Sequence, residues 1–379
     1  MRYVMPVTIM RGGTSKGVFV RQADFIGWDD AALRDRIIKA LMGTPDPMQI
    51  DGLGGTHSST SKVMVVGPGL REGIDLEYTF VQVGIDLPIV DYRGNCGNLT
   101  AAVTPFALAE GLTRAQAPLA RVMMWNANTR KRILAEVPYG RAGVVEEGDF
   151  QIDGVPGSGA PITTHFYEPA GSVTGRLFPT SRPRDAVRTS RGEFEVSIVD
   201  VTNPFVFVRA ADLELDCTEL SSAVNANPEI LALLEEIREQ AAVLAGIHAD
   251  SAAAAKSNMP AIGFVAPPRD YVTVGGARIT AGQVDLLGRV VSVRRVHHAY
   301  AGTGAMCTAA AARLAGTIPH EVAAARGNGG RVTIGHSKGT VSAGVEIGSG
   351  ADGRQTVTSV SIARTARRIM RGEAYIYLR

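Results

Sequence analysis

The sequence has little of several features that mark particular classes of protein. Its 379 residues include only three cysteines, Cys96, Cys217 and Cys307, which lie far apart and show no paired spacing. This argues against a disulfide-linked scaffold and against a structural zinc site. No apolar run approaches the ~18 residues of a membrane-spanning helix, and the first residues lack the basic start and apolar stretch of a signal peptide. We therefore expect a cytoplasmic protein with no membrane partner.

An excess of charge of one sign is also lacking. The chain has 39 basic and 37 acidic residues, a net charge of +2, and no basic run. This composition gives no reason to expect a nucleic-acid partner, so a small molecule is the expected ligand. With 45% hydrophobic residues and 43 glycines, the chain suits a turn-rich α/β or α+β enzyme of two domains. The proline-rich segment 178–185 predicts domains 1–186 and 187–379, with the last strand as a candidate to return to the first.

The stretch 91–102 contains the most informative cysteine. Two apolar strand segments, 78–83 and 87–90, precede it, and an alanine-rich helix closed by Gly111 follows it. Cys96 is thereby predicted at or just before a helix N-terminus. The helix dipole and free backbone N–H groups there favour a thiolate, and they also hold anions such as carboxylates.

A similar stretch occurs much later in the chain. Residues 291–296 predict a strand, 299–305 a tight turn of small residues, and 306–314 another helix. Aligning residues 96–98 with residues 301–303 indicates two related halves, each presenting one helix N-terminus to a shared cleft. The first half has a cysteine at that position and the second has an alanine.

Two further segments are candidates for ligand binding. Residues 10–17 form a glycine-rich turn with two cations and two hydroxyls, which suits a carboxylate or phosphate but lacks the P-loop spacing. A hairpin turn with solvated cations is an equally good interpretation. The long loop 44–62 is poor in apolar residues and ends at Lys62, and such loops are often functional. Lys62 is either a solvated strand end or, in a partly dry cleft, a base with a lowered pKa.

Other polar residues have weaker claims to a function. His57 is better interpreted as a loop histidine than as a ligand, because no second ligand lies at metal spacing. Lys256 and His297 either line the cleft or are, respectively, a solvated lysine and a histidine of the core or of a solvated strand end. We expect the arginines of segment 364–370 at the surface.

Residues 10–17, 51–63 and 94–102 together resemble the PrpF-type 2-methylaconitate cis-trans isomerases. This family also includes aconitate, 4-oxalomesaconate and methylitaconate Δ-isomerases. The resemblance extends over nearly the whole chain, including Asn203-Pro204 and the turn 301–304. It implies an α+β (mixed α/β) diaminopimelate epimerase-like fold: two similar halves, each with a mixed sheet around a central helix, and an active site in the cleft between them.

The resemblance also implies the site residues. Lys62 and Cys96 would be the proton-transfer pair, with Cys96 either a proton carrier or a positioning group. No redox cofactor or metal is required for the reaction. The candidate substrate-binding residues are Arg11, Gly12, Thr14, Ser15, Ser58, Ser59, Thr60, Ser61, Gly97, Asn98, Gly302, Thr303 and Gly304.

The expected function is cofactor-independent movement of a double bond in an unsaturated tricarboxylate such as 2-methylaconitate or aconitate. The serine-rich end of the loop before Lys62 looks like the 2-methylaconitate branch of the family, which is linked to propionate catabolism, although His57 departs from it. Alternatives are 4-oxalomesaconate or methylitaconate isomerisation, a racemase or epimerase, which Ala301 disfavours, and a non-catalytic carboxylate-binding accessory protein. The candidate associations are a homodimer and a functional link to an aconitase-type dehydratase.

Overall fold

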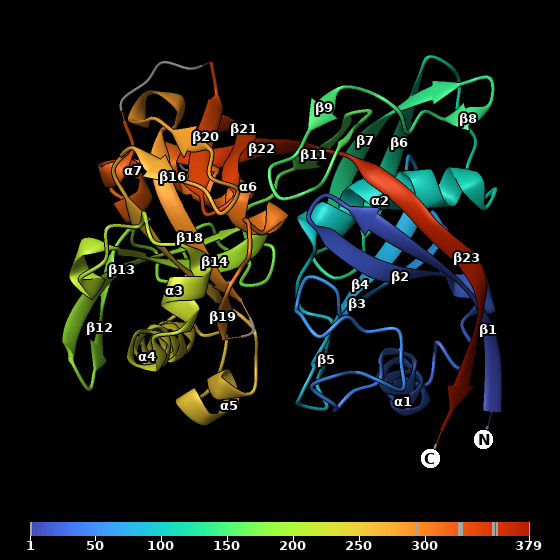
Figure 1. The fold of residues 1–379 in the computed structure, drawn as a ribbon, viewed down its shortest axis with the longest axis horizontal. Helices are drawn as coiled ribbons and strands as arrows, with labels where there is room; N and C mark the ends of the chain where they lie inside the picture. Colours follow the sequence, from blue (N-terminus) through green and yellow to red (C-terminus); the bar gives the residue numbers. More distant parts are fainter. Residues whose placement is uncertain (1, 293, 325–328, 351–352, 354, 379) are drawn as a thin grey trace. The chain divides into compact units, whose positions relative to one another are not determined.

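The chain forms two compact units, and within each unit the strands pair both in parallel and antiparallel (Figure 1). The computed structural model describes residues 2–292, 294–324, 329–350, 353 and 355–378. The first unit comprises Met1–His165 and Ala363–Arg379, and the second comprises Phe166–Ile362. The predicted boundary near residue 186 thus falls inside the second unit, in β12 (Asp185–Thr189).

The C-terminal segment belongs to the first unit because of strand pairing. There β23 (Ala366–Tyr377) pairs along β1 (Arg2–Gly12), which forms an antiparallel hairpin with β2 (Ser15–Arg21). Next, β2 runs parallel to β3 (Lys62–Pro68), and β3 is antiparallel to β4 (Leu76–Val83). Further strands are β5 (Val90–Asp91), β6 (Leu119–Asn126), β7 (Lys131–Gly140), β8 (Gly143–Val144), β9 (Phe150–Gln151) and β10 (Ser158–Gly159), and β11 (Ile162–Tyr167) crosses the boundary between the units.

Two helices of the first unit have different environments. The amphipathic α1 (Ala31–Met42) is N-capped by Asp30, ends at Gly43 with a φ of 72°, and buries one face in the core. By contrast, α2 (Gly97–Ala109) is buried from Gly97 to Ala107 and contacts β1, β2, β3, β7, β8 and β23. A helix that is apolar all round must lie inside the fold. Within the described ranges, no helix combines the length and apolar character needed to cross a membrane.

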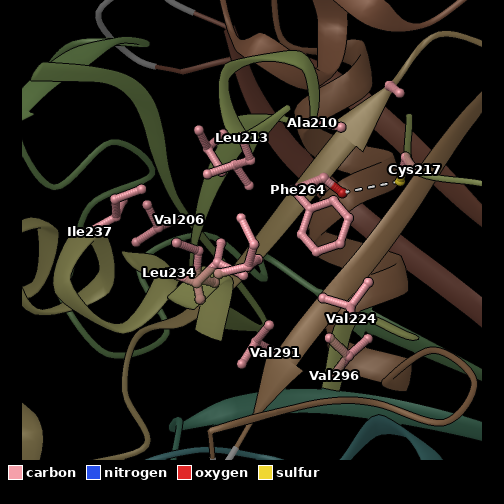
Figure 2. Packing of buried hydrophobic residues seen from close by; sticks show 14 of the residues in the cluster. Val206, Ala210, Leu213, Cys217, Val224, Leu234, Ile237, Phe264, Val291 and Val296 are labelled. Atoms are coloured by element: carbon pink, nitrogen blue, oxygen red, sulfur yellow. Dashed lines mark hydrogen bonds between the residues drawn. The ribbon is translucent and has the colours of Figure 1, made fainter. Parts of the chain in front are cut away.

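The second unit has its own core, shown in Figure 2. Helix α4 (Pro228–Leu244), N-capped by Asn227, contributes Leu234 and Ile237 to this core. They belong to the same cluster as Val206 and Phe264 of the sheet, and the thiol of Cys217 donates to the Phe264 carbonyl at 3.7 Å. The strands are β12, β13 (Gly192–Val201), β14 (Asn203–Arg209), β15 (Ala261–Ala266), β16 (Tyr271–Val272), β17 (Arg278–Ile279), β18 (Leu286–Ser292), β19 (Arg295–Val296), β20 (Arg331–His336), β21 (Gly339–Ser349) and β22 (Gln355–Arg364), whose last two residues belong to the first unit. The other helices are α3 (Ser221–Asn225), α5 (Ser251–Ala255), α6 (Gly302–Arg313) and α7 (Ile318–Val322).

The internal repeat predicted from the sequence is confirmed by the topology. In each unit two parallel strands are joined through an outer helix, as β2–α1–β3 and as β14–α4–β15. The next long strand, β4 or β18, is antiparallel to the strand before it. It is followed by a buried helix, α2 or α6, and then by a strand that runs parallel to it, β6 or β20. Cys96 is the N-cap of α2 and Ala301 is the N-cap of α6, so the predicted alignment of the two turns holds.

Candidate active site

Lys62 is a buried lysine at the first position of β3, with 8% of its surface exposed. Its ammonium donates to Oε1 of Gln82, its partner on β4, and lies 5.1 Å from the centre of the Phe80 ring. Among the described residues, no carboxylate forms an ion pair with it. Burial lowers the pKa of Lys62, and the nearby Cys96 thiol opposes part of that shift. The alternative of a solvated strand end is therefore wrong for Lys62.

Gln82 fixes the direction of the Lys62 ammonium. Its amide nitrogen donates to the backbone oxygens of Ser58 at 3.2 Å and Ser61 at 3.0 Å. Because carbonyl oxygens only accept, the amide oxygen of Gln82 must face the lysine. A neutral amide orients the ammonium without the negative charge that would raise its pKa. Gln82 was not predicted as a site residue, because the alternation of side chains along a strand gives the direction of Gln82 but not its partner.

Two hydroxyls of the loop before Lys62 have structural partners. The side chain of Ser61 is fully buried and accepts from Nε2 of Gln49 at 2.9 Å. The hydroxyl of Thr60 donates to the backbone oxygen of Gly55 at 2.8 Å. Both bonds hold the loop to itself, and the substrate contacts predicted for these residues stay predictions.

The other two hydroxyls differ from each other. Ser59 Oγ lies 2.9 Å from Nδ1 of His57, whose ring also accepts from the Ser59 backbone at 3.1 Å. Thus His57 has a loop-internal role, as the sequence favoured. Within the described part of the chain, the hydroxyl of Ser58 has no hydrogen-bond partner. Of the four hydroxyls predicted in this loop, only that of Ser58 has no hydrogen-bond partner among the described residues, and its contact with a substrate stays a prediction.

Cys96 lies at the N-terminus of α2, with 7% of its surface exposed. Its side chain does not cap the helix, so it leaves the first-turn N–H groups, those of Gly97 and Asn98 included, without a cap from this residue. The thiol donates a long hydrogen bond to Ser15 Oγ at 3.9 Å. This is the geometry expected from the sequence: a cysteine beside backbone donors that attract anions.

A buried network of polar side chains supports the turn that contains Cys96. The Thr100 hydroxyl donates to the backbone oxygen of Cys96 at 3.0 Å, and the Tyr78 hydroxyl donates to Oδ1 of Asn95 at 3.2 Å. Asn126 Nδ2 donates to the same tyrosine oxygen at 2.9 Å. Burial raises the pKa of Tyr78, which therefore stays neutral and structural.

Two glycines let the β1–β2 turn lie against the first turn of α2. A Cβ on Gly12 would lie 2.6 Å from the backbone oxygen of Asn98. Gly13 has a φ of +50°, and its Cβ would lie 2.3 Å from Oδ1 of Asn98 and 2.9 Å from Cδ of Arg364. Thr14 Oγ1 accepts from Nδ2 of Asn98 at 3.0 Å. The glycine-rich motif is therefore required by close packing.

Arg11 is engaged within the first unit. Its Nη1 donates to the backbone oxygen of Thr365 at 2.8 Å and to its hydroxyl at 2.9 Å. Burial lowers the pKa of Arg11, as does the neighbouring Arg367, while Glu146 opposes the shift. Arg11 thus ties the β1–β2 hairpin to the C-terminal segment, and its predicted contact with a substrate stays a prediction.

Arg364 corrects the expectation that the C-terminal arginines are at the surface. Arg367 and Arg368 are exposed, but only 5% of Arg364 is exposed. Its Nε donates to Oδ1 of Asn98 at 2.9 Å, across 266 positions of sequence. Burial lowers the pKa of Arg364 to about 10, and Cys96 acts against this shift. Nothing in the local sequence distinguishes Arg364 from Arg367 and Arg368. Its burial depends on the β1–β2 hairpin, which lies next to the end of β22.

Three predicted residues belong to the second unit. Gly302, Thr303 and Gly304 form the buried first turn of α6. The hydroxyl of Thr303 accepts from Nδ2 of Asn203 at 3.4 Å, and its backbone oxygen accepts from the hydroxyl of Thr202 at 3.2 Å. A hairpin thus packs on a helix N-terminus here as well. The predicted place of these residues in the same site as the lysine of β3 stays a prediction.

The remaining candidates have ordinary environments. Lys256 is exposed at the end of α5, as expected for a solvated lysine. His297 is buried, accepts from the backbone of Ala299 at 3.1 Å and stacks on His298 at 4.7 Å between ring centres. No group of three or more histidine, cysteine, aspartate or glutamate side chains in the described ranges is arranged to hold a metal ion.

The fold is similar to that of solved isomerase and epimerase structures. A hydroxyproline epimerase structure from Agrobacterium vitis is similar over 99% of this chain and 94% of its own, with a TM-score of 0.59 and 15% identity. A methylitaconate-Δ-isomerase structure is similar over 99% and 96%, with a TM-score of 0.79 and 42% identity. The expected mixed α/β, diaminopimelate epimerase-like fold is confirmed.

Relatives at higher identity then define the family. The PrpF protein family model matches residues 2–377, so the chain belongs to the PrpF family and is an isomerase. A 3-methylitaconate isomerase of Eubacterium barkeri is 42% identical over 98% of this chain and 97% of its own. A 2-methyl-aconitate isomerase of Shewanella oneidensis is 39% identical over 96% and 95%.

The glycine packing predicts a stability difference between two matched substitutions. Gly13 and Gly73 both have positive φ, but a Cβ on Gly73 would meet nothing within 4 Å. We expect Gly73→Ala to lower the free energy of unfolding by ~1–2 kcal/mol from backbone strain. Gly13→Ala should cost a further ~1–3 kcal/mol because the added methyl overpacks the site. Urea unfolding measures both, and equal losses would contradict the packing assigned to Gly13.

Proposed function

We propose that this isomerase moves the double bond of a small unsaturated di- or tricarboxylate by proton transfer, with Lys62 as the base. The observation that carries the proposal is the state of Lys62: buried, held by the neutral Gln82 and without a carboxylate partner among the described residues. Desolvation favours its neutral amine, which is the form that accepts a proton.

The reaction balances with these two groups. The amine of Lys62 takes a proton from the carbon next to the alkene, and the electron pair moves into a dienolate. A proton then returns to a different carbon, either from the lysine itself or from the Cys96 thiol, in which case the lysine proton restores the thiol. Rotation about the bond that is single in the dienolate gives cis-trans isomerisation.

The surroundings suit an intermediate that carries extra negative charge. The first-turn N–H groups of α2 and the buried Arg364 guanidinium both favour an anion close to Cys96. A racemase that uses two thiols is less well supported, because the position equivalent to Cys96 is Ala301. A binding protein without activity would not need a desolvated lysine.

Isotope exchange tests the reaction and the base together. In deuterated water, isomerisation of 2-methylaconitate, aconitate or methylitaconate should place deuterium in the product. Lys62→Arg should reduce turnover by ~10²–10⁴-fold, because the guanidinium stays protonated and cannot act as base. Lys256→Arg, an exposed change of the same type, serves as the control. Exchange at a saturated stereocentre, or near-normal turnover of Lys62→Arg, would reject this mechanism.

The pH dependence tests the neutral partner of the lysine. Activity should rise with pH as Lys62 loses its proton, with a midpoint below the usual lysine pKa because burial lowers it. Gln82→Glu places a carboxylate beside the ammonium, so the pKa of Lys62 should rise by about one unit or more. The rise of activity with pH should then move to higher pH. Profiles of kcat/KM for wild type and variant decide this, with Cys96→Ser as a second background to exclude titration of the thiol. If kcat/KM rises at the same pH in the variant as in the wild type, Lys62 does not control the pH dependence.

The substrate proposal rests on the loop before Lys62. We propose that kcat/KM for 2-methylaconitate or aconitate exceeds that for 4-oxalomesaconate by at least ~10-fold, about 1.4 kcal/mol in transition-state binding. The Ser58 hydroxyl, which lacks a partner within the described residues, supports an additional hydrogen bond to a carboxylate. A parallel assay that includes methylitaconate ranks the four acids, and a preference for 4-oxalomesaconate would overturn this order.

A further inference from the structure

Arg364 is a buried cation near Cys96 for which the proposed function names no binding partner on the substrate. Its guanidinium lies at the N-terminal turn of α2, where Nε donates to Oδ1 of Asn98 and Nη1 donates to the Ala363 carbonyl at 2.9 Å. Both acceptors are neutral. Among the residues that the structure describes, no carboxylate pairs with Arg364, and its Nη2 has no hydrogen-bond partner.

A buried cation without a counter-ion is costly unless a ligand supplies the charge. Buried charges in proteins are normally paired, because removing an ion from water is expensive. Among the described residues, the group of opposite potential charge that acts on Arg364 is the Cys96 thiol, which offsets part of the lowering of the Arg364 pKa by burial. A guanidinium also presents paired N–H donors that match a carboxylate.

The local backbone keeps this guanidinium in place. Asn98 is held on both sides, since its amide nitrogen donates to Thr14 and its oxygen accepts from Arg364. Gly13 has no side chain, and the space beside it is occupied by the Asn98 amide and the Arg364 stem. Arg364 therefore has an orientation set before any ligand binds, which lowers the entropic cost of binding.

We propose that Arg364 and the first turn of α2 bind one carboxylate of the substrate. The inference rests on the proposed function for the identity of the ligand. The carboxylate would take its hydrogen bonds from first-turn N–H groups and from Nη2 of Arg364, which has no partner among the described residues. It would then be the counter-ion of Arg364. Arg364 is then a specificity residue that selects anionic substrates and places their carbon chain next to Cys96.

Binding of a non-reacting acid tests this without relying on turnover. Propane-1,2,3-tricarboxylate is saturated, so it can bind but cannot isomerise. We expect Arg364→Gln to raise its Kd, measured by calorimetry, by about 10- to 100-fold, the usual range for a lost charge-assisted hydrogen bond. Arg368→Gln, which removes the same charge from an exposed site on β23, should change Kd by less than about twofold.

A conservative variant protects the test against misfolding. Arg364→Lys keeps the buried charge but cannot bond to Asn98 and to a carboxylate with the same geometry, so Kd and KM should rise about 10-fold with little change in kcat. Wild-type Kd in either folded Arg364 variant would overturn the proposal. A fall in kcat with unchanged Kd would do the same, because it would assign Arg364 to Cys96 instead of the substrate.

The two proposals fail in different ways. If the wild type binds the tricarboxylate, Arg364→Gln loses that binding, and no deuterium exchange occurs with any acid, the carboxylate site stands and the isomerisation mechanism falls. If exchange occurs and Arg364→Gln keeps a normal KM, the mechanism stands and the carboxylate site falls.

Discussion

The first unit depends on the burial of two cations that have no carboxylate partner among the described residues. Lys62 and Arg364 are each held by a neutral amide, Gln82 and Asn98 respectively, and for both cations the Cys96 thiol offsets part of the lowering of the pKa by burial. A carboxylate at either amide position would offset the desolvation cost, but it would also keep the lysine protonated and compete with an anionic ligand. Amides orient the cations without adding charge, so the fold positions both cations and leaves their charge without a carboxylate among the described residues.

The backbone makes this burial possible by bringing three distant segments together. The glycine turn between β1 and β2 lies on the first turn of α2. Thr365, the residue after β22, joins the glycine turn because its backbone oxygen accepts from the backbone nitrogen of Gly13 at 2.9 Å. The second unit repeats the hairpin-on-helix arrangement with Asn203 and Thr303. Its equivalent of Cys96 is an alanine, so the repeat supplies the frame and the individual side chains supply the chemistry.

Features governed by neighbouring residues were predictable from the sequence. Asn227 followed by proline marks the start of α4, and the glycine in a left-handed conformation at residue 43 marks the end of α1. Cys96 and Ala301 emerged as equivalent N-caps because each strand, turn and helix is encoded in about twenty consecutive residues. Long motifs indicated the family, and the resemblance to that family implied Lys62 as the base and Cys96 as its partner.

By itself the sequence determined the elements, the repeat, the family and the places of Lys62 and Cys96. Only the tertiary structure decided which side chains surround them: Gln82 through the β3–β4 register, and Arg364 through a bond spanning 266 positions. It also showed that Thr60 and Ser61 face partners within their own loop. The reason is physical, because capping and periodicity act over a few residues, whereas the partner and burial of a polar side chain depend on strand register and on the return of distant segments.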